Sequence, residues 1–240
     1  MPTAPFQVKT PAELAAQPEE YRVAIAKIII SHAINELYGS QVFDEPAIAL
    51  APTPYWKWLT CRLAMEEYGH HIRFFELGRE IGIAEDEMLP QKSSKRPLSI
   101  FEHPLESWID FCTIKLLADM AEIVQVEDLL KCTYVPLRNA ARMTMPEERF
   151  HAKFGEDAAR ELIKDAEGKA QLQDSIDRIF PALPAFFGRA GSKNNEAFRK
   201  WGIKQRSNEA MRADYVERCR ILVEEKLGLK LPQAPHADAG

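Results

Sequence analysis

The sequence EYGH at residues 67–70 and the sequence ERFH at residues 148–151 decide how this chain is interpreted. Each is a Glu-x-x-His motif inside a long segment with helical periodicity. Because three residues are nearly one turn of an α-helix, the carboxylate and the imidazole of each motif project from the same face. Two such motifs on facing helices, together with one carboxylate from each of two further helices, form the ligand set of a di-iron or di-manganese centre in a four-helix bundle. The two motifs therefore predict two more inward-facing carboxylates, one on each of two further helices.

Helical periodicity dominates the rest of the chain, and no segment shows convincing strand alternation. We expect helices over about residues 19–43, 53–83, 104–131, 136–164, 169–180 and 207–228, with a polar loop over 84–99. This pattern predicts an all-α fold: a four-helix bundle with additional C-terminal helices. We expect one domain over residues 1–240, with the core bundle at about 19–164 and a C-terminal helical extension at about 165–232.

The composition excludes several classes of protein. The chain of 240 residues is 46% hydrophobic and 28% charged, which suits a helix-rich globular domain, and its net charge of -5 argues against nucleic acid as a partner. No apolar run is long enough to cross a membrane, and the N-terminus lacks the pattern of a signal peptide, so we expect a cytoplasmic protein. The four cysteines are widely spaced and are interpreted as buried thiols in a reducing compartment.

Spacing along the chain identifies the two additional carboxylates. Glu36 lies 31 positions before Glu67, and Asp119 lies 29 positions before Glu148. Similar separations are what two antiparallel helix hairpins need if each returns to the same depth in the bundle. Both acids interrupt otherwise apolar stripes, and a charge that faces the core is costly unless it is paired or bound to a metal. The predicted metal ligands are therefore Glu36, Glu67, His70, Asp119, Glu148 and His151.

Some neighbouring residues permit other interpretations. A single Glu-x-x-His motif usually marks a solvated helix face, so the prediction depends on the two motifs and their matched upstream carboxylates. Glu122, one turn beyond Asp119, is the alternative ligand on its helix. His32 is either a packed core histidine or a partner of a ligand, and Glu66 and Glu147 are interpreted as solvated or helix-capping neighbours. Oxygen-rich ligation with only two imidazoles suits iron or manganese better than zinc or copper.

Five stretches together resemble a known family. They are HAINE at 32–36, EYGH at 67–70, SIF at 99–101, EERFH at 147–151 and KWGIKQRSNE at 200–209. Over about residues 20 to 232 the chain is similar to the phenylacetic acid catabolic family, to which the catalytic subunits of phenylacetyl-CoA 1,2-epoxidases belong. The resemblance implies a ferritin-like fold and a multicomponent di-iron monooxygenase of bacterial aromatic catabolism.

The resemblance also implies roles for the candidate ligands. It places Glu36, Glu67 and His70 on one iron and the other three ligands on the second, with Glu67 and Glu148 bridging the two ions. The complete ligand set is typical of the catalytic subunit and not of its paralogous partner, and the aspartate at 119 fits the CoA-thioester epoxidases better than ferritins. The implied cofactors are two iron ions, with iron and manganese as a variant. The implied partners are an aryl-CoA thioester, O2, a separate reductase, and a paralogous subunit or a second copy of the chain, with neither nucleic acid nor a membrane involved.

Several expectations about the surroundings follow. The apolar candidates for the substrate space are Phe74, Met120, Ile123 and Phe150. The basic candidates for contact with CoA are Lys92, Lys95, Arg96, Lys200, Lys204 and Arg206. Pro146 is expected to kink its helix and so to re-aim the ERFH motif.

Three other functions remain open from the sequence. One is a ferritin-like protein that handles iron or scavenges peroxide, and another is a non-catalytic subunit. The third is a related di-metal oxygenase with a different substrate.

Overall fold

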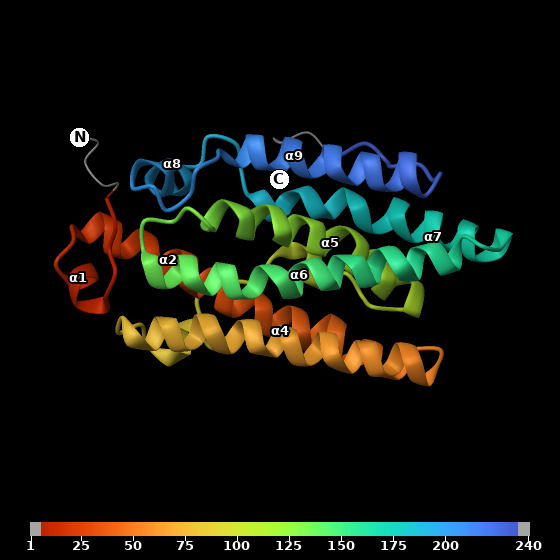
Figure 1. Ribbon diagram of the computed structural model, residues 1–240, viewed down its shortest axis with the longest axis horizontal. Helices are drawn as coiled ribbons and strands as arrows, with labels where there is room; N and C mark the ends of the chain where they lie inside the picture. Colours follow the sequence, from red (N-terminus) through yellow and green to blue (C-terminus); the bar gives the residue numbers. More distant parts are fainter. Residues whose placement is uncertain (1–5, 235–240) are drawn as a thin grey trace.

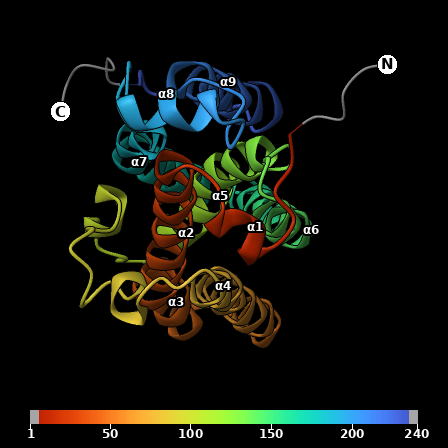
Figure 2. The same cartoon turned by 90° about the vertical axis from the view of Figure 1, so that its left-hand side faces the viewer.

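Four long helices run side by side along the molecule and carry the candidate ligands (Figure 1). The computed structural model describes residues 6–234. The long helices are α2 (Glu19–Gly39), α4 (Pro54–Glu80), α5 (Trp108–Leu129) and α6 (Val135–Leu162). Helix α2 packs on α4, α5 packs on α6, and contacts between α4 and α6 join the two pairs. The end-on view of Figure 2 shows these helices grouped as a bundle, so the all-α, ferritin-like prediction is confirmed.

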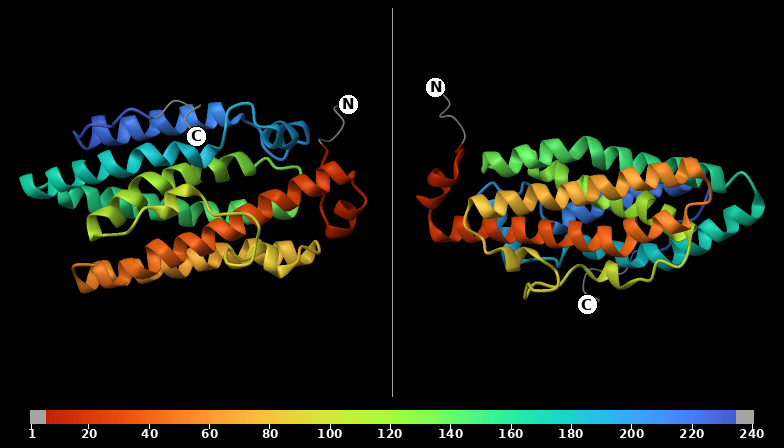
Figure 3. Two further views of the ribbon diagram at one scale, coloured as in Figure 1. Left: turned by 180° about the vertical axis from the view of Figure 1, so that it is seen from behind. Right: turned by 90° about the horizontal axis from the view of Figure 1, so that it is seen from below.

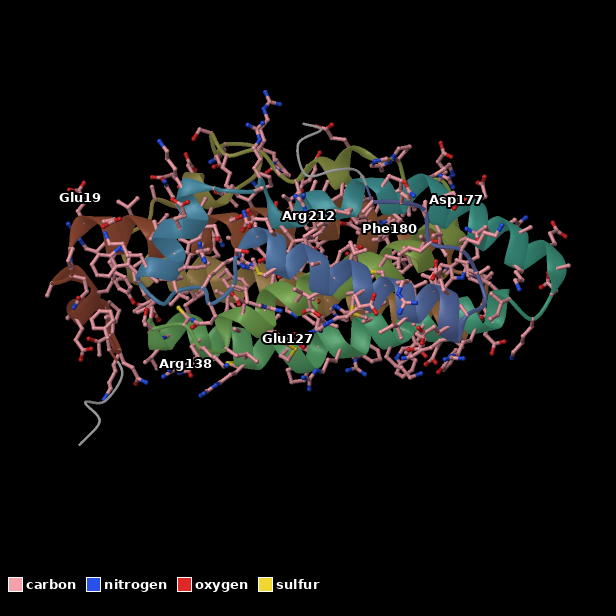
Figure 4. All side chains as sticks on the ribbon, turned by 90° about the horizontal axis from the view of Figure 1, so that it is seen from above. Glu19, Glu127, Arg138, Asp177, Phe180 and Arg212 are labelled. Carbon is pink, nitrogen blue, oxygen red and sulfur yellow. The ribbon has the colours of Figure 1, made fainter. Side chains whose placement is uncertain are left out.

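The C-terminal part of the chain forms a further layer over the bundle (Figures 1 and 4). Its elements are α7 (Ala166–Ile179), the 3-10 segment η4 (Phe180–Phe187), α8 (Lys193–Lys200), α9 (Asn208–Arg220) and the π-helical segment η5 (Ile221–Lys226). Helices α7 and α9 both pack on α5. Phe180, labelled in Figure 4 at the end of α7, stacks on Tyr215 of α9 with the ring centroids 6.1 Å apart. One hydrophobic cluster contains residues of α5 together with residues of the C-terminal layer. That the whole chain is a single domain stays a prediction.

Local sequence signals explain where the helices begin. The hydroxyl of Thr53 accepts a hydrogen bond from the backbone N–H of Trp56 at the start of α4, and Ser107 does the same for Asp110 at the start of α5. Each such cap contributes about 1 kcal/mol to helix stability. Ser207, the N-cap of α9, accepts a hydrogen bond from the backbone N–H of Ala210. Helix α8 was not expected, because eight residues are too few for a clear helical period.

The first long helix differs from the expected single helix over 19–43. Helix α2 ends at Gly39, a π-helical segment η1 (Ser40–Asp44) follows, and α3 (Glu45–Leu50) continues beyond it. A π-helical turn is wider than an α-helical turn and changes which residues face the bundle. A Cβ at Gly39 would lie 3.0 Å from the ring of Phe101, so the missing side chain lets the η3 segment (Ser99–Glu102) approach. Figure 3 shows the connection between α4 and α5, which contains η2 (Glu85–Met88) and η3, running beside α2.

Pro146 does not interrupt its helix. Helix α6 is continuous from Val135 to Leu162, and Glu148 and His151, which follow the proline, are both buried.

A short helix, α1 (Pro11–Ala15), precedes the bundle. Within residues 6–234, no helix is both long enough and apolar enough to cross a membrane.

Candidate metal centre

The six predicted ligands converge inside the bundle, and all of them are buried. Helix α2 contributes one ligand, α4 two, α5 one and α6 two. Their ligand atoms form two groups, each with every atom within 4.8 Å of the others: Glu36, Glu67, His70 and Glu148 in one, and Glu67, Asp119 and His151 in the other. Glu67 belongs to both groups. The two hairpins therefore return their acids to the same depth, which is the geometry that the matched spacings require.

Two carboxylates are shared between the two imidazoles. Glu67 directs Oε2 toward Nδ1 of His70 at 3.3 Å and Oε1 toward Nδ1 of His151 at 3.0 Å. Glu148 directs Oε1 toward Nδ1 of His70 at 3.0 Å and Oε2 toward Nδ1 of His151 at 4.0 Å. A carboxylate whose two oxygens face two different imidazoles has the geometry of a bridge between two metal ions.

The hydrogen-bonding state of these atoms tests whether a metal pair fits. Nδ1 of His70, Nδ1 of His151, Oδ2 of Asp119 and Oε1 of Glu148 are all buried without a hydrogen-bond partner among the described residues. The same atoms already lie close to opposite charges: Nδ1 of His70 is 3.0 Å from Glu148, Nδ1 of His151 is 3.0 Å from Glu67, and Oδ2 of Asp119 is 3.1 Å from Nζ of Lys115. Because they converge on one space, cations there could take the place of these contacts once the two imidazoles had lost their Nδ1 protons. The donor set of carboxylate oxygens and imidazole nitrogens fits iron or manganese.

Burial and mutual charge shift the pKa values of the cluster. Burial disfavours the charged form of His151, but the Glu67 carboxylate outweighs burial and raises the pKa to about 10. For His70, burial is likewise outweighed, chiefly by Glu148, and the pKa lies well above its usual value. Burial raises the pKa of Glu148 to about 7 and that of Asp119 well above the ordinary value. The metal-free cluster therefore holds protons at neutral pH, and bound metal ions must displace them.

The alternative ligand Glu122 contacts His32. Its Oε1 is 3.3 Å from Nδ1 of His32, which is also 3.7 Å from Oε1 of Glu36. The ring of His32 stacks on Phe74 with the centroids 4.6 Å apart. His32, Glu36 and Glu122 form a third group of possible ligand atoms within 4.8 Å of one another, whereas Asp119 is grouped with Glu67 and His151.

The interpretation of Glu66 and Glu147 as solvated neighbours is wrong. Oε2 of Glu147 lies 3.0 Å from Nε2 of His70, and Oε2 of Glu66 lies 2.9 Å from Nε2 of His151. Each acid directly precedes a ligand glutamate in the sequence, and this Glu-Glu doublet is the signal that could have identified them. They face the imidazoles from the side opposite the cluster.

A buried lysine inside the cluster was not predicted. Nζ of Lys115 lies 2.6 Å from Oε1 of Glu67, 3.1 Å from Oδ2 of Asp119 and 3.2 Å from Oδ1 of Asp44. Lys115 precedes Asp119 by one helical turn, and the π-helical segment η1 supplies Asp44. The lysine therefore supplies one positive charge among buried carboxylates.

Two cavities open beside the cluster. The inner cavity has a volume of about 60 Å³ and is lined by the ligand carboxylates and by apolar residues that include Phe43, Ile100, Ile114, Ala118 and Phe186. The outer cavity has a volume of about 520 Å³ and shares Asn35, Glu122 and Phe186 with the inner one. None of the expected apolar residues lines the inner cavity. The ring of Phe74 stacks on His32, that of Phe150 lies under the guanidinium of Arg62, and Met120 and Ile123 pack in the hydrophobic clusters.

Two of the basic residues expected at a CoA site line the outer cavity, namely Lys95 and Lys204. Three others form ion pairs with acidic side chains: Lys92 with Asp86, Lys200 with Glu20 and Arg206 with Asp128. Lys27, which was not expected, also lines the outer cavity, so three lysines and the acids Glu87 and Glu122 contribute its charge.

Comparison with known proteins agrees with this geometry. Residues 10–240 match the family described as "Phenylacetic acid catabolic protein". The chain is also 30% identical over 237 residues to one of the subunits of the 1,2-phenylacetyl-CoA epoxidase of Escherichia coli (strain K12). That alignment covers 95% of this chain and 76% of the relative.

Proposed function

The chain belongs to the phenylacetic acid catabolic protein family, and on this premise we propose that it is the catalytic subunit of a di-iron oxygenase in aromatic catabolism. The proposed reaction inserts one oxygen atom of O2 into the aromatic ring of an aryl-CoA thioester. The observation that carries the proposal is the convergence of four buried carboxylates and two buried imidazoles from four helices, in which Glu67 and Glu148 each direct their two oxygens toward the Nδ1 atoms of both imidazoles.

The proposed cofactor is a pair of iron ions, with manganese at one position as a variant. Glu36, Glu67 and His70 would hold one ion, and Asp119, Glu148 and His151 would hold the other, with Glu67 and Glu148 bridging. The chemistry that such a pair supplies when bound is the reduction of O2, with one oxygen atom delivered to the ring and the other released as water.

Residues of the chain itself would bind the metal ions and line the space for the substrate. The two imidazoles give up their Nδ1 protons when metal binds, because the nitrogen lone pair must face the ion. Phe43, Ile100 and Ile114 form an apolar part of the wall of the inner cavity, beside the ligand carboxylates, where an aromatic ring could pack. The outer cavity has space for the thioester arm, and Lys95 and Lys204 on its wall would attract the phosphates of CoA.

Other components follow from the same proposal. The relative is named as one subunit of an epoxidase, so we infer that this chain also works with other subunits. A paralogous subunit or a second copy of the chain is the proposed structural partner. A separate reductase is the proposed electron donor, because the sequence has no fingerprint of a flavin or nicotinamide site. The proposed compartment is the cytoplasm. An iron-storage role is not favoured by the family match.

Reconstitution tests the proposal. Purified protein would receive ferrous iron, a generic reductase and a panel of aryl-CoA thioesters, and oxygen-dependent products would be identified by mass spectrometry. We expect an epoxide or its rearrangement product from phenylacetyl-CoA. The exposed Glu76→Gln variant on α4 serves as the control with normal activity, and Glu148→Ala should give no product. Iron-dependent oxygen uptake with no product from any thioester would contradict the proposal.

A further inference from the structure

Two carboxylates make hydrogen bonds between helices α4 and α6, on the side of the imidazoles that faces away from the candidate metal centre. Glu66 on α4 accepts a hydrogen bond from Nε2 of His151 on α6 at 2.9 Å. Glu147 on α6 accepts one from Nε2 of His70 on α4 at 3.0 Å. Each acid thus accepts a hydrogen bond from the histidine of the opposite helix, so the two contacts between α4 and α6 are reciprocal.

Each of these carboxylates is itself held by an arginine. Nη2 of Arg73 donates to Oε1 of Glu147 at 2.8 Å, and Nη1 of the same side chain donates to Oε2 and to Thr144. Nε of Arg62 donates to Oε1 of Glu66 at 2.8 Å. Such charge-assisted hydrogen bonds restrict the orientation of the carboxylate.

The two arginines differ in solvent exposure and in the number of hydrogen bonds that they donate to their glutamate. The side chain of Arg73 is 24% exposed and uses both forks on Glu147, whereas that of Arg62 is 44% exposed and uses one. The guanidinium of Arg62 also lies 3.8 Å above the ring centroid of Phe150. The Glu147 contact is therefore the more rigid of the two.

The hydrogen bonds determine which nitrogen of each imidazole can bind a cation. A neutral imidazole has one N–H and one lone pair, and an acceptor at Nε2 keeps the proton there. The lone pair then lies on Nδ1, which is the atom that faces Glu67 and Glu148 in both rings. A carboxylate behind a ligand histidine also increases the donor strength of the ring.

We propose that Glu66 and Glu147 are positioning residues for the metal centre, each setting the tautomer, orientation and donor strength of the histidine on the facing helix. The inference rests on the proposed function, because it requires a metal pair at the cluster. It adds that the orientation and donor strength of each imidazole are set by an acid on the facing helix. The orientation of His70 is the more restricted of the two, because Arg73 holds its partner Glu147.

The test uses ferrous iron as the probe, titrated anaerobically into the metal-free full-length chain. Four variants are compared, Glu66→Gln, Glu66→Ala, Glu147→Gln and Glu147→Ala. The glutamines keep an oxygen that accepts from Nε2 but remove the charge, and the alanines remove both. Matched controls are Glu76→Gln on α4 and Glu156→Gln on α6, since both acids pair with an arginine of their own helix away from the cluster.

We expect each alanine variant to lose 10–100-fold in iron affinity, as removal of such a partner typically does, with the larger loss at Glu147. The glutamine variants should lose less affinity but shift the reduction potential of the bound iron to a higher value, because a less negative environment favours the ferrous form. The controls should match the unmodified chain in both measurements.

A purely structural role would lower thermal stability without changing the potential. Glutamine variants with an unchanged potential and alanine variants with unchanged iron affinity would therefore overturn the inference. If the unmodified chain itself binds no iron, the proposed function fails instead, so the two failures are distinguishable.

Discussion

Substitution of Gly155 by alanine should destabilise the protein, because this glycine lies where α6 comes closest to α5. A Cβ at Gly155 would lie 2.3 Å from the backbone nitrogen of Leu116 and 2.5 Å from the carbonyl carbon of Lys115. Atoms in contact are normally about 3.5–4.0 Å apart, so the helices must separate by about 1 Å. Both obstructing atoms belong to the backbone and cannot rotate away as a side chain can.

The magnitude follows from two opposing effects. Overpacking costs typically 1–3 kcal/mol, and a clash with backbone belongs at the upper end of that range, about 3 kcal/mol. Alanine in place of glycine inside a helix contributes about 1 kcal/mol in the other direction. The net loss is about 2 kcal/mol, which for a domain of this size lowers the melting temperature by about 4–8 °C.

The assay is thermal and urea unfolding of the metal-free protein, followed by circular dichroism. Gly69→Ala is the matched control, because a Cβ at Gly69 would meet no atom within 4 Å. This control should be as stable as the unmodified chain or slightly more stable. Separation of α5 from α6 would also move His151 away from Asp119, so Gly155→Ala should bind less iron. A Gly155→Ala variant that is as stable as Gly69→Ala would refute the close-packing argument.

Three other predictions follow from the cluster. The metal-free protein should lose stability as the pH rises from 5 to 9. Burial raises the pKa of Glu148 to about 7, and Glu67 raises the pKa of His151 to about 10 against burial, so the folded state holds more protons than the unfolded chain in this interval. Urea unfolding midpoints measured with a chelator present would check this, and a midpoint that rises with pH would contradict it. Lys115→Met should destabilise the metal-free protein by about 3 kcal/mol, because three buried carboxylates lose their cation, and added ferrous iron should restore part of the loss in urea unfolding; equal stability without iron would argue against the ion pairs. Phe186→Ala should widen the link between the two cavities and change the preference for bulkier aryl-CoA thioesters by about 10-fold in kcat/KM, and an unchanged preference would exclude this residue from substrate selection.

Features that depend on helical periodicity were accessible from the sequence alone. The 3.6-residue period predicted the four long helices, and the three-residue spacing within each motif put Glu67 beside His70 and Glu148 beside His151. Matched separations then selected Glu36 and Asp119. The relations within each motif are local, because the geometry of one helix fixes the direction of every side chain on it. The matched separations require in addition only that consecutive long helices pack antiparallel. The role of these residues as metal ligands stays a prediction.

Features that depend on contacts between helices were decided only by the tertiary structure. The partners of Glu66 and Glu147 lie on the opposite helix, and the crossing geometry of α4 and α6 determines that these acids face imidazoles instead of solvent. Asp44 enters the cluster region through a π-helical segment that a regular period does not predict, and there it pairs with Lys115. The lining of the inner cavity likewise depends on how α5, η3 and η4 approach one another, since packing between distant segments has no signature in the local pattern.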